Sequence, residues 1–151
     1  MAEAKPNSGP TQPGAQAFVL FPLGKKRFAL PADRVTELAR PDRLQSFPHT
    51  TPLLSGVLVR RGRIVPVLDV AQVLIGPDPP ARKFYLIATR KFDGAAEWTA
   101  IPVTGECELT NAAAVAPGER LPGYVTGLLP LSGEIVEVVD LERLAAGEAR
   151  V

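Results

Sequence analysis

The sequence predicts a mainly β protein built from two similar units. Its 151 residues include 16 prolines and 13 glycines, which divide the chain into short segments and leave little room for long helices. These segments are rich in Val, Ile, Leu and Phe, a composition typical of β-strands. With 46% hydrophobic residues the chain can bury a core, and its length suits one compact domain or two small lobes that share a core.

The two units are indicated by an internal repeat. Residues 56–74, GVLVRRGRIVPVLDVAQVL, align without gaps with residues 127–145, GLLPLSGEIVEVVDLERLA, and seven of the 19 positions are identical. Residues 29–38 and 100–109 align at the same offset of 71, with four identities. A unit of about 70 residues buries too little surface to be stable alone, so we expect the copies to pack together as interleaved lobes. The alternative is that short Val- and Ile-rich hairpins converged by composition.

The chain begins with a stretch that predicts no regular structure. Residues 1–16 are rich in Pro, Gly, Gln and Ser and lack apolar periodicity, so we expect a flexible tail there and a domain over residues 17–151. Two apolar runs on either side of LGKKR then predict a hairpin with Gly24 in its turn.

The next elements are a short alternating segment and a second hairpin. Residues 34–39 fit either a strand or a short helix, because nearby prolines limit any helix to a few turns. Residues 56–69 predict a hairpin that turns at Arg61 and Gly62. In the second half we expect strands near residues 83–89, 97–103, 105–110, 124–131 and 134–139.

Two aspartates at equivalent places in the repeat, Asp69 and Asp140, precede the predicted short helices. A carboxylate there can accept hydrogen bonds from free backbone N–H groups, so we interpret both as helix N-caps. A catalytic carboxylate pair is the alternative interpretation.

Charge is distributed unevenly along the chain. Residues 24–63 contain nine basic and three acidic residues, a net +6, whereas residues 97–142 contain eight acidic residues and one basic residue, a net −7. We expect a dipolar molecule that docks between differently charged neighbours. The net charge of the whole chain is only +1, which gives no general case for a polyanionic partner.

The sequence offers little chemistry for catalysis, for metals or for cofactors. His49 is the single histidine and has no second ligand at metal spacing, and Cys107 lies in a presumed strand without a partner base. No glycine-rich phosphate-binding motif follows a strand. The sequence has a single cysteine, and it contains neither an apolar run long enough to span a membrane nor the apolar core of a signal peptide. We therefore expect a cytoplasmic protein that does not insert into membranes. We therefore predict a protein that is not an enzyme.

A nucleic-acid-binding β-barrel is a weaker alternative. Such binding needs several phosphate contacts and aromatic stacking platforms, but no aromatic residue interleaves with Arg60, Arg61 and Arg63. In the second copy of the repeat the turn reads Leu-Ser-Gly-Glu, so folding does not require these arginines. Divergence at an exposed hairpin tip is typical of adaptation to a protein partner.

Three segments resemble the CheW-like chemotaxis adaptor domain. They are FVLFPLGKKRFALPADRVTELARP, GVLVRRGRIVPVLDVAQVLIG and YVTGLLPLSGEIVEVVDLERL, and the similarity runs from Phe18 to Leu144. The resemblance implies two packed SH3-like, five-stranded β-barrel lobes. It also implies a scaffold without catalysis that links the cytoplasmic tips of methyl-accepting chemoreceptors to the CheW-like regulatory domain of a CheA-type histidine kinase. Other CheW-like proteins are further possible partners, and the expected location is the cytoplasm at receptor arrays.

The resemblance also implies a partner-binding site. Val35 matches an apolar position of the receptor-binding groove between the lobes, and Glu37 and Gly56 match nearby positions. Arg61 matches the arginine of the Arg-Gly turn, where a bidentate contact with an acidic group would order the hairpin or hold a partner. Arg60 and Arg63 could join the site or simply be solubilising charges.

Some positions depart from the family pattern. Val59 and Arg60 stand where Asn-Leu is usual, and Glu106 replaces an apolar residue, so we expect Glu106 to be exposed or paired. The chain also ends soon after the last matching segment. These departures support an alternative, a specialised paralogue that binds receptors without coupling to the kinase, as in a Frz-type gliding-motility pathway.

Overall fold

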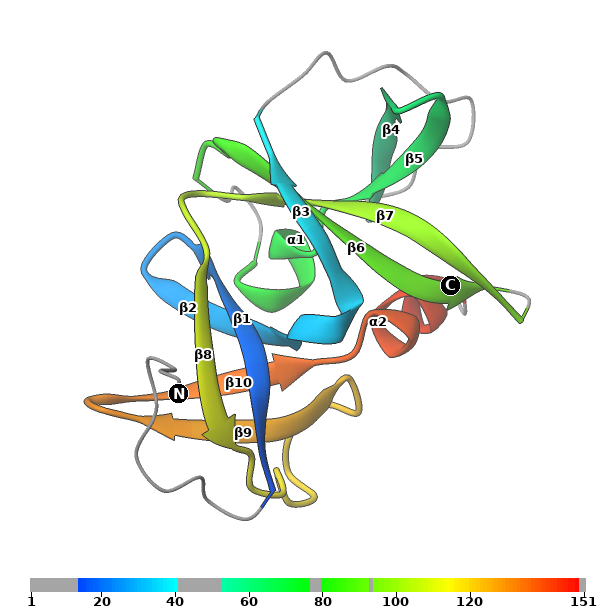
Figure 1. The fold of residues 1–151 in the computed structure, drawn as a ribbon. Helices are drawn as coiled ribbons and strands as arrows, with labels where there is room; N and C mark the ends of the chain where they lie inside the picture. The colour runs from blue at the N-terminus through cyan, green and yellow to red at the C-terminus, as the bar shows by residue number, and fades with distance from the viewer. Residues whose placement is uncertain (1–13, 41–52, 77–79, 93, 150–151) are drawn as a thin grey trace.

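The computed structural model describes residues 14–40, 53–76, 80–92 and 94–149, which form two five-stranded sheets with short helices at their junction (Figure 1). One sheet, called lobe A, has the strand order β8-β1-β2-β10-β9, and the other, called lobe B, has the order β3-β6-β7-β5-β4. The prediction of a mainly β fold with two five-stranded lobes and short helices is confirmed.

The bounds of the elements are as follows. Lobe A contains β1 (Ala15–Leu23), β2 (Lys26–Pro31), β8 (Glu108–Ala113), β9 (Val125–Leu131) and β10 (Glu134–Val139). Lobe B contains β3 (Val35–Ala39), β4 (Leu54–Arg60), β5 (Arg63–Leu68), β6 (Phe84–Phe92) and β7 (Ala95–Val103). The helices are a 3-10 turn, η1 (Ala32–Arg34), α1 (Ala71–Leu74) and α2 (Leu141–Ala149).

Strands that are 71 residues apart occupy the same place in the two sheets. The corresponding pairs are β1 and β6, β2 and β7, β3 and β8, β4 and β9, and β5 and β10. When each strand of lobe A is replaced by its counterpart, the result is the strand order of lobe B. Each lobe therefore combines two strands from one copy of the repeat with three from the other. The copies meet in two parallel strand pairs, β2 with β10 and β5 with β7, and in two antiparallel pairs, β1 with β8 and β3 with β6. The remaining neighbouring strands, which belong to the same copy, are antiparallel.

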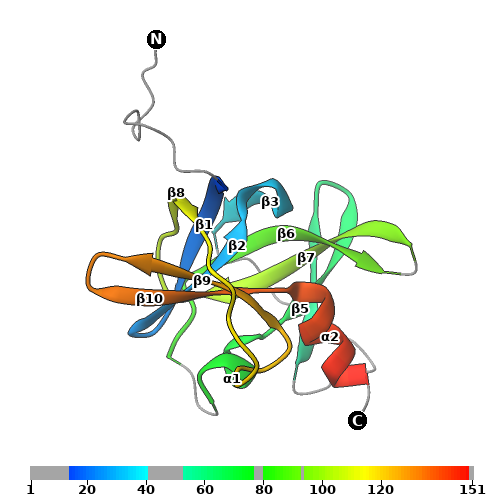
Figure 2. The ribbon, with the colours of Figure 1, turned by 90° about the horizontal axis from the view of Figure 1, so that it is seen from below.

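The largest hydrophobic cluster lies between the lobes. Phe21 and Phe28 from lobe A belong to this cluster together with Leu86 of lobe B and with buried residues of α1 and α2. These two helices lie where the lobes meet (Figure 2). A smaller cluster fills each barrel, around Val136 in lobe A and around Val65 in lobe B. The central cluster buries apolar side chains of both sheets against each other, so we expect the two lobes to fold as one unit.

Several local predictions are confirmed and others need correction. The first hairpin turns at Gly24 with a φ of 70°, residues 35–39 form a strand after the η1 turn, and Glu106 is exposed. The strand expected from residue 105 begins only at Glu108, so Cys107 lies in the preceding loop. β1 already contains residues 15 and 16, while residues 1–13 of the predicted tail, and His49, lie outside the described residues.

The two aspartates of the repeat do not share one role. The Oδ1 atom of Asp140 accepts a hydrogen bond from the backbone N–H of Arg143 at 3.0 Å and caps α2, as predicted. The predicted capping role of Asp69 is wrong, because α1 has no side-chain cap and the Asp69 carboxylate accepts a hydrogen bond from the Arg82 guanidinium. An ion pair is the stronger interaction for a carboxylate that is 1% exposed.

Some of the charges that lie far apart in the sequence form ion pairs in the structure. Arg27 pairs with Glu108 and Glu134, and Arg34 pairs with Glu142 at 2.8 Å. These contacts join the basic and acidic stretches because each sheet contains strands from both. Part of the basic stretch is thus neutralised by the acidic one, and the dipolar molecule that we expected stays a prediction. None of the described helices is long and apolar enough to span a bilayer.

Candidate protein-docking site

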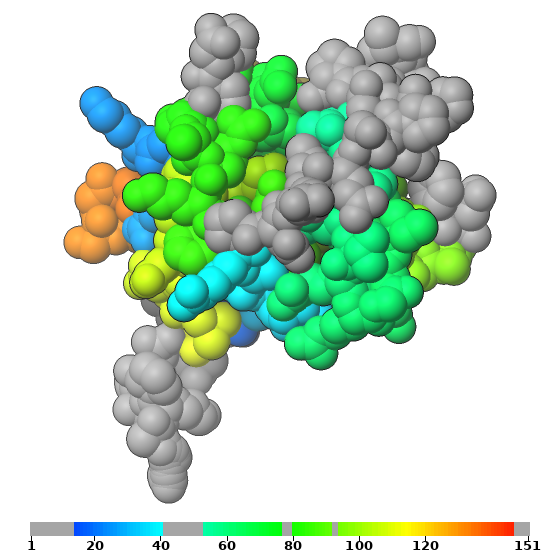
Figure 3. Space-filling view, turned by 90° about the horizontal axis from the view of Figure 1, so that it is seen from above, coloured from blue at the N-terminus to red at the C-terminus, as the bar shows by residue number. Residues whose placement is uncertain are grey.

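The β4–β5 hairpin lies beside β3 (Figure 3). Arg60, Arg61 and Arg63 stand at its turn and form the arginine cluster. Arg61 and Gly62 form its two-residue turn with φ values of 52° and 76°. Positive φ at both positions is what a type I′ turn requires, and it matches the right-handed twist of the strands. For a residue with a side chain this conformation costs roughly 1 kcal/mol, so Arg61 is not the residue that turn stability alone would favour.

Glu37 on β3 binds two of the arginines. Its carboxylate accepts hydrogen bonds from Nε and Nη2 of Arg60 at 2.9 and 3.0 Å, and from Nη2 of Arg61 at 3.2 Å. The hydrogen bonds from Arg60 are the main cause of a lowered pKa of Glu37, and the charge of Arg61 lowers this pKa further. Glu37 is therefore ionised at neutral pH.

The bidentate contact belongs to Arg60 rather than to Arg61. β3 and β4 are the outermost strands of lobe B, so the Arg60–Glu37 pair links the two edges of its sheet. In lobe A the corresponding closure is made by the backbone, through N–H···O bonds of 2.8 and 2.9 Å between Val115 and Leu128. Arg60 thus stabilises the barrel, whereas the Arg61 side chain makes one contact with Glu37 and is 67% exposed.

Arg63 lies on the aromatic ring of Trp98. Its guanidinium carbon is 4.3 Å from the ring centroid, in cation–π geometry. The sequence placed no aromatic residue among the arginines, but the parallel pairing of β5 with β7 brings Trp98 beneath Arg63. Because the guanidinium covers the indole face, Trp98 is not an open stacking platform for a nucleic-acid base.

Val35 and Gly56, the other two predicted site residues, are less exposed than Arg61 and Arg63. Val35 begins β3 opposite Ala88 and is half-buried against the cluster between the lobes. Gly56 is buried in β4, next to a shift in the register with β5. Val35 and Glu37 are thus close along one strand, while Gly56 can influence a partner only through the backbone of β4.

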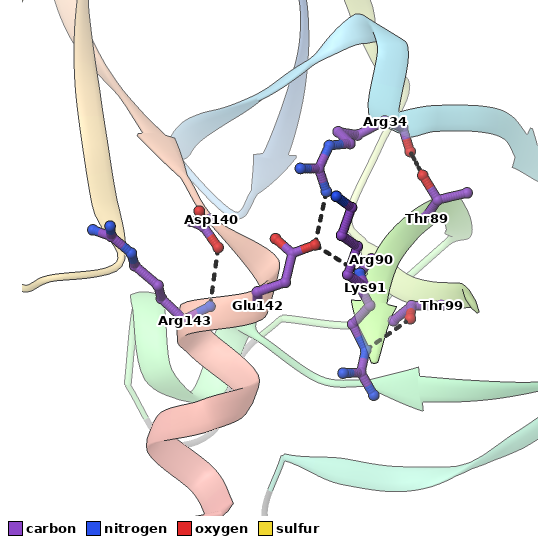
Figure 4. Close-up of polar contacts among 8 residues, drawn as sticks. All are labelled: Arg34, Thr89, Arg90, Lys91, Thr99, Asp140, Glu142 and Arg143. Carbon is purple, nitrogen blue, oxygen red and sulfur yellow. Dashed lines mark hydrogen bonds and ion pairs between the residues drawn. The ribbon is translucent and has the colours of Figure 1, made fainter. Parts of the chain in front are cut away.

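Sequence reasoning missed a second polar cluster, which holds the lobes together (Figure 4). Oε2 of Glu142 accepts hydrogen bonds from Nη1 of Arg34 at 2.8 Å and from the backbone N–H of Lys91 at 2.7 Å. Burial alone would raise the pKa of Glu142, but these hydrogen bonds and the charge of Arg34 bring it to about 2. The repeat could not indicate this cluster, since copy one has Ala71 at the position of Glu142.

One small cavity and one cysteine are candidate sites for small-molecule chemistry. The cavity beside Glu142, lined by residues of both lobes, has a volume of about 60 Å³, far below the hundreds of Å³ typical of ligand pockets. Burial raises the pKa of the Cys107 thiol to about 11, so the nucleophilic thiolate is scarce at neutral pH.

Two alanine substitutions should separate the structural arginine from the exposed one. We expect Arg60→Ala to lower the free energy of unfolding by about 1–2 kcal/mol, because two charge-assisted hydrogen bonds to Glu37 are lost. Arg61→Ala should change it by less than about 0.5 kcal/mol, as is usual for an exposed ion pair. Urea denaturation measures both values, and equal losses would contradict this division of roles.

Comparisons with known proteins identify the family and the fold of the chain. The family model of the CheW-like domain matches residues 17–145. The chain is 36% identical over 59 residues to Protein FrzA of Myxococcus xanthus, a stretch that spans 39% of this chain and only 37% of that protein.

The fold also matches that of a solved scaffolding protein, TtCheW from Thermoanaerobacter tengcongensis. The TM-score is 0.72 at 18% identity, and the match covers 85% of this chain and 91% of the TtCheW chain. The chain has two β-barrel lobes that share one core, and the family model matches nearly all of the described residues. The chain therefore belongs to the family of CheW-like domains.

Proposed function

We propose that this protein is a non-catalytic adaptor that links the cytoplasmic tips of methyl-accepting chemoreceptors to a CheA-type histidine kinase. Membership of the CheW-like family supports a scaffolding role in chemosensory signalling. A cytoplasmic location at receptor arrays is part of this proposal. The raised pKa of Cys107 and the small cavity beside Glu142 are consistent with a protein that binds other proteins rather than a substrate.

The receptor contact in this proposal is formed by β3 and the β4–β5 hairpin. The observation that carries it is the position of Val35, half-buried at the edge of the cluster shared by the lobes, two residues before Glu37. Glu37 fixes Arg60 and Arg61 beside this apolar edge. A helical receptor tip would bury apolar side chains against Val35 and place a carboxylate on Arg61, a modest and reversible interface.

A pull-down with a receptor cytoplasmic fragment tests this contact. We expect Val35→Glu to reduce binding at least about tenfold, because a charge would enter the apolar edge, and Arg61→Ala to weaken binding by a smaller factor. Leu109→Ser, at a 69% exposed position on β8, serves as a control that should bind normally. Unchanged binding by both Val35→Glu and Arg61→Ala would exclude the proposed contact.

A second candidate function is a paralogue that binds receptors without activating the kinase. The similarity to Protein FrzA supports it, as do the departures from the family pattern at Val59 and Arg60. A reconstituted assay of receptor, kinase and this protein distinguishes the two candidates. Strong kinase activation on adding this protein supports the adaptor role and excludes the uncoupled paralogue.

A further inference from the structure

The polar contact around Glu142 lies directly beside Val35 in the chain and links three elements (Figure 4). Arg34 is the last residue of η1, and Val35 follows it as the first residue of β3. Oε2 of Glu142 accepts hydrogen bonds from the Arg34 guanidinium at 2.8 Å and from the backbone N–H of Lys91 at 2.7 Å. Glu142 is in the first turn of α2 and Lys91 is in β6, so one carboxylate oxygen joins α2, η1 and β6.

The hydrogen bonds of the sheet fix Val35 less firmly than the rest of β3. Val35 pairs with Ala88, but the register between β3 and β6 shifts between Val35 and Glu37, as it does at a β-bulge. A bulge interrupts the regular ladder and bends the strand, so the direction of a side chain beside it depends on other contacts. The position of Val35 is therefore sensitive to whatever holds the η1 turn in front of it.

The η1 turn has little packing of its own. None of its three residues is buried, and a cavity of about 60 Å³ lies beside Arg34, Thr89 and Glu142. The backbone carbonyl of Arg34 accepts a hydrogen bond from the Thr89 hydroxyl, but at 3.4 Å this bond is long and weak. The turn consequently depends on the ion pair between Arg34 and Glu142.

The repeat shows that the fold does not require this ion pair. The positions equivalent to Arg34 and Glu142 in the other copy are occupied by Gly105 and Ala71, so neither partner is present there. Both sheets nevertheless have the same order of equivalent strands. The ion pair is therefore an addition beside β3, the strand that forms the proposed receptor contact.

We propose that Glu142 is a positioning residue for the receptor contact, because through Arg34 it holds Val35 at the apolar edge where a receptor tip would bind. This inference rests on the proposed function and adds a role for α2, a helix outside that contact. Coupling between two sites is reciprocal, so a receptor bound at Val35 would in turn strengthen the attachment of α2.

Binding of a receptor cytoplasmic fragment to the full chain, measured by isothermal titration calorimetry, tests this role. We expect Glu142→Gln and Arg34→Gln each to weaken binding by about three- to tenfold, the range usual for residues that act through others. Arg34→Lys keeps a cation beside Glu142 and should weaken binding less than Arg34→Gln does. Thermal unfolding shows whether each variant is folded at the temperature of the titration.

Arg27→Gln is the matched control for stability. It also removes an arginine that pairs with glutamates of another element, Glu108 and Glu134. Arg27 lies near the start of β2, at the opposite end of that strand from η1, so its loss should not move Val35. We therefore expect Arg27→Gln to bind the receptor fragment normally.

Hydrogen exchange provides a second readout, which a purely structural ion pair would not change. The receptor fragment should slow the exchange of the α2 amides in the natural protein by about three- to tenfold, the same factor as the change in affinity. This protection should disappear in Arg34→Gln and remain in Arg27→Gln.

The outcomes separate this inference from the receptor contact on which it rests. Weak binding by Val35→Glu, together with normal binding by Glu142→Gln and Arg34→Gln, would overturn the positioning role and leave the contact intact. A loss of affinity in Arg27→Gln as large as in Glu142→Gln would also overturn it, because binding would then follow stability alone. Normal binding by both Val35→Glu and Arg61→Ala would refute the contact itself, and the positioning role with it.

Discussion

Replacing Phe28 with alanine should lower the free energy of unfolding by about 3–5 kcal/mol. Phe28 is fully buried in the cluster between the lobes, with its ring centroid 6.1 Å from that of Phe21. The ammonium of Lys26 lies 5.2 Å from the Phe28 ring. Truncation removes these contacts and leaves a cavity that well-packed neighbours on both lobes cannot fill.

The same substitution tests whether the lobes unfold together. Trp98 is the only tryptophan and lies in lobe B, whereas Phe28 lies in lobe A. If the shared cluster couples the lobes, Phe28→Ala should lower the urea midpoint by the same amount for both probes. The probes are Trp98 fluorescence, which reports on lobe B, and far-UV circular dichroism, which reports on the whole chain. Leu109→Ala, at an exposed position of lobe A, should shift neither transition by more than about 0.5 kcal/mol. If Phe28→Ala leaves the urea midpoint followed by Trp98 fluorescence unchanged, the lobes unfold independently.

Glu142→Gln is the second substitution with a large expected effect, a loss of about 2 kcal/mol of stability at neutral pH. The glutamine keeps the shape of the side chain but removes the charge that faces Arg34. The loss is smaller than the pKa of about 2 alone would imply, because solvent screens the Glu142 side chain, which is 28% exposed.

The pH dependence of this loss follows from the direction of the pKa shift. The unfolded chain binds a proton at Glu142 near pH 4.3, whereas the folded protein binds it only near pH 2. The stabilisation is therefore complete above the unfolded pKa and is lost as the pH falls from about 4.3 to about 2. The difference in unfolding free energy between the natural protein and Glu142→Gln should shrink over this range.

Urea denaturation at several acidic pH values measures this difference. Glu106→Gln, at an exposed position, controls for the loss of a carboxylate elsewhere in the chain. A difference between the natural protein and Glu142→Gln that stays constant from neutral pH to pH 2 would contradict the ionic role of Glu142. An effect of Glu106→Gln as large as that of Glu142→Gln would also contradict it.

Much of the fold could be predicted because its signals are local. Gly24 marks the first hairpin turn, and Arg61-Gly62 marks the second between two apolar runs. The offset of 71 links strands that do occupy equivalent places in the two sheets. Asp140 caps its helix as the pattern indicates, because capping depends on neighbours three residues away.

The candidate site could be predicted only in part. The sequence and the family resemblance indicated Glu37 and the arginines of one hairpin, but they gave the bidentate contact with a carboxylate to Arg61, which is wrong. Arg60 holds it because the end of β4 lies beside β3, a contact between strands that are far apart in the chain. Trp98 was missed for the same reason, since only strand pairing brings it under Arg63.

By itself, the sequence determined the strand order along the chain, the turns and the duplication, because these depend on apolar periodicity and turn residues. Only the tertiary structure decided how the copies interleave, which charges neutralise each other and which remain exposed. Arg27 and Glu134 are 107 residues apart, yet they pair because each sheet takes strands from both copies. Electrostatic energy depends on distance in space, and no linear count of charges contains that distance.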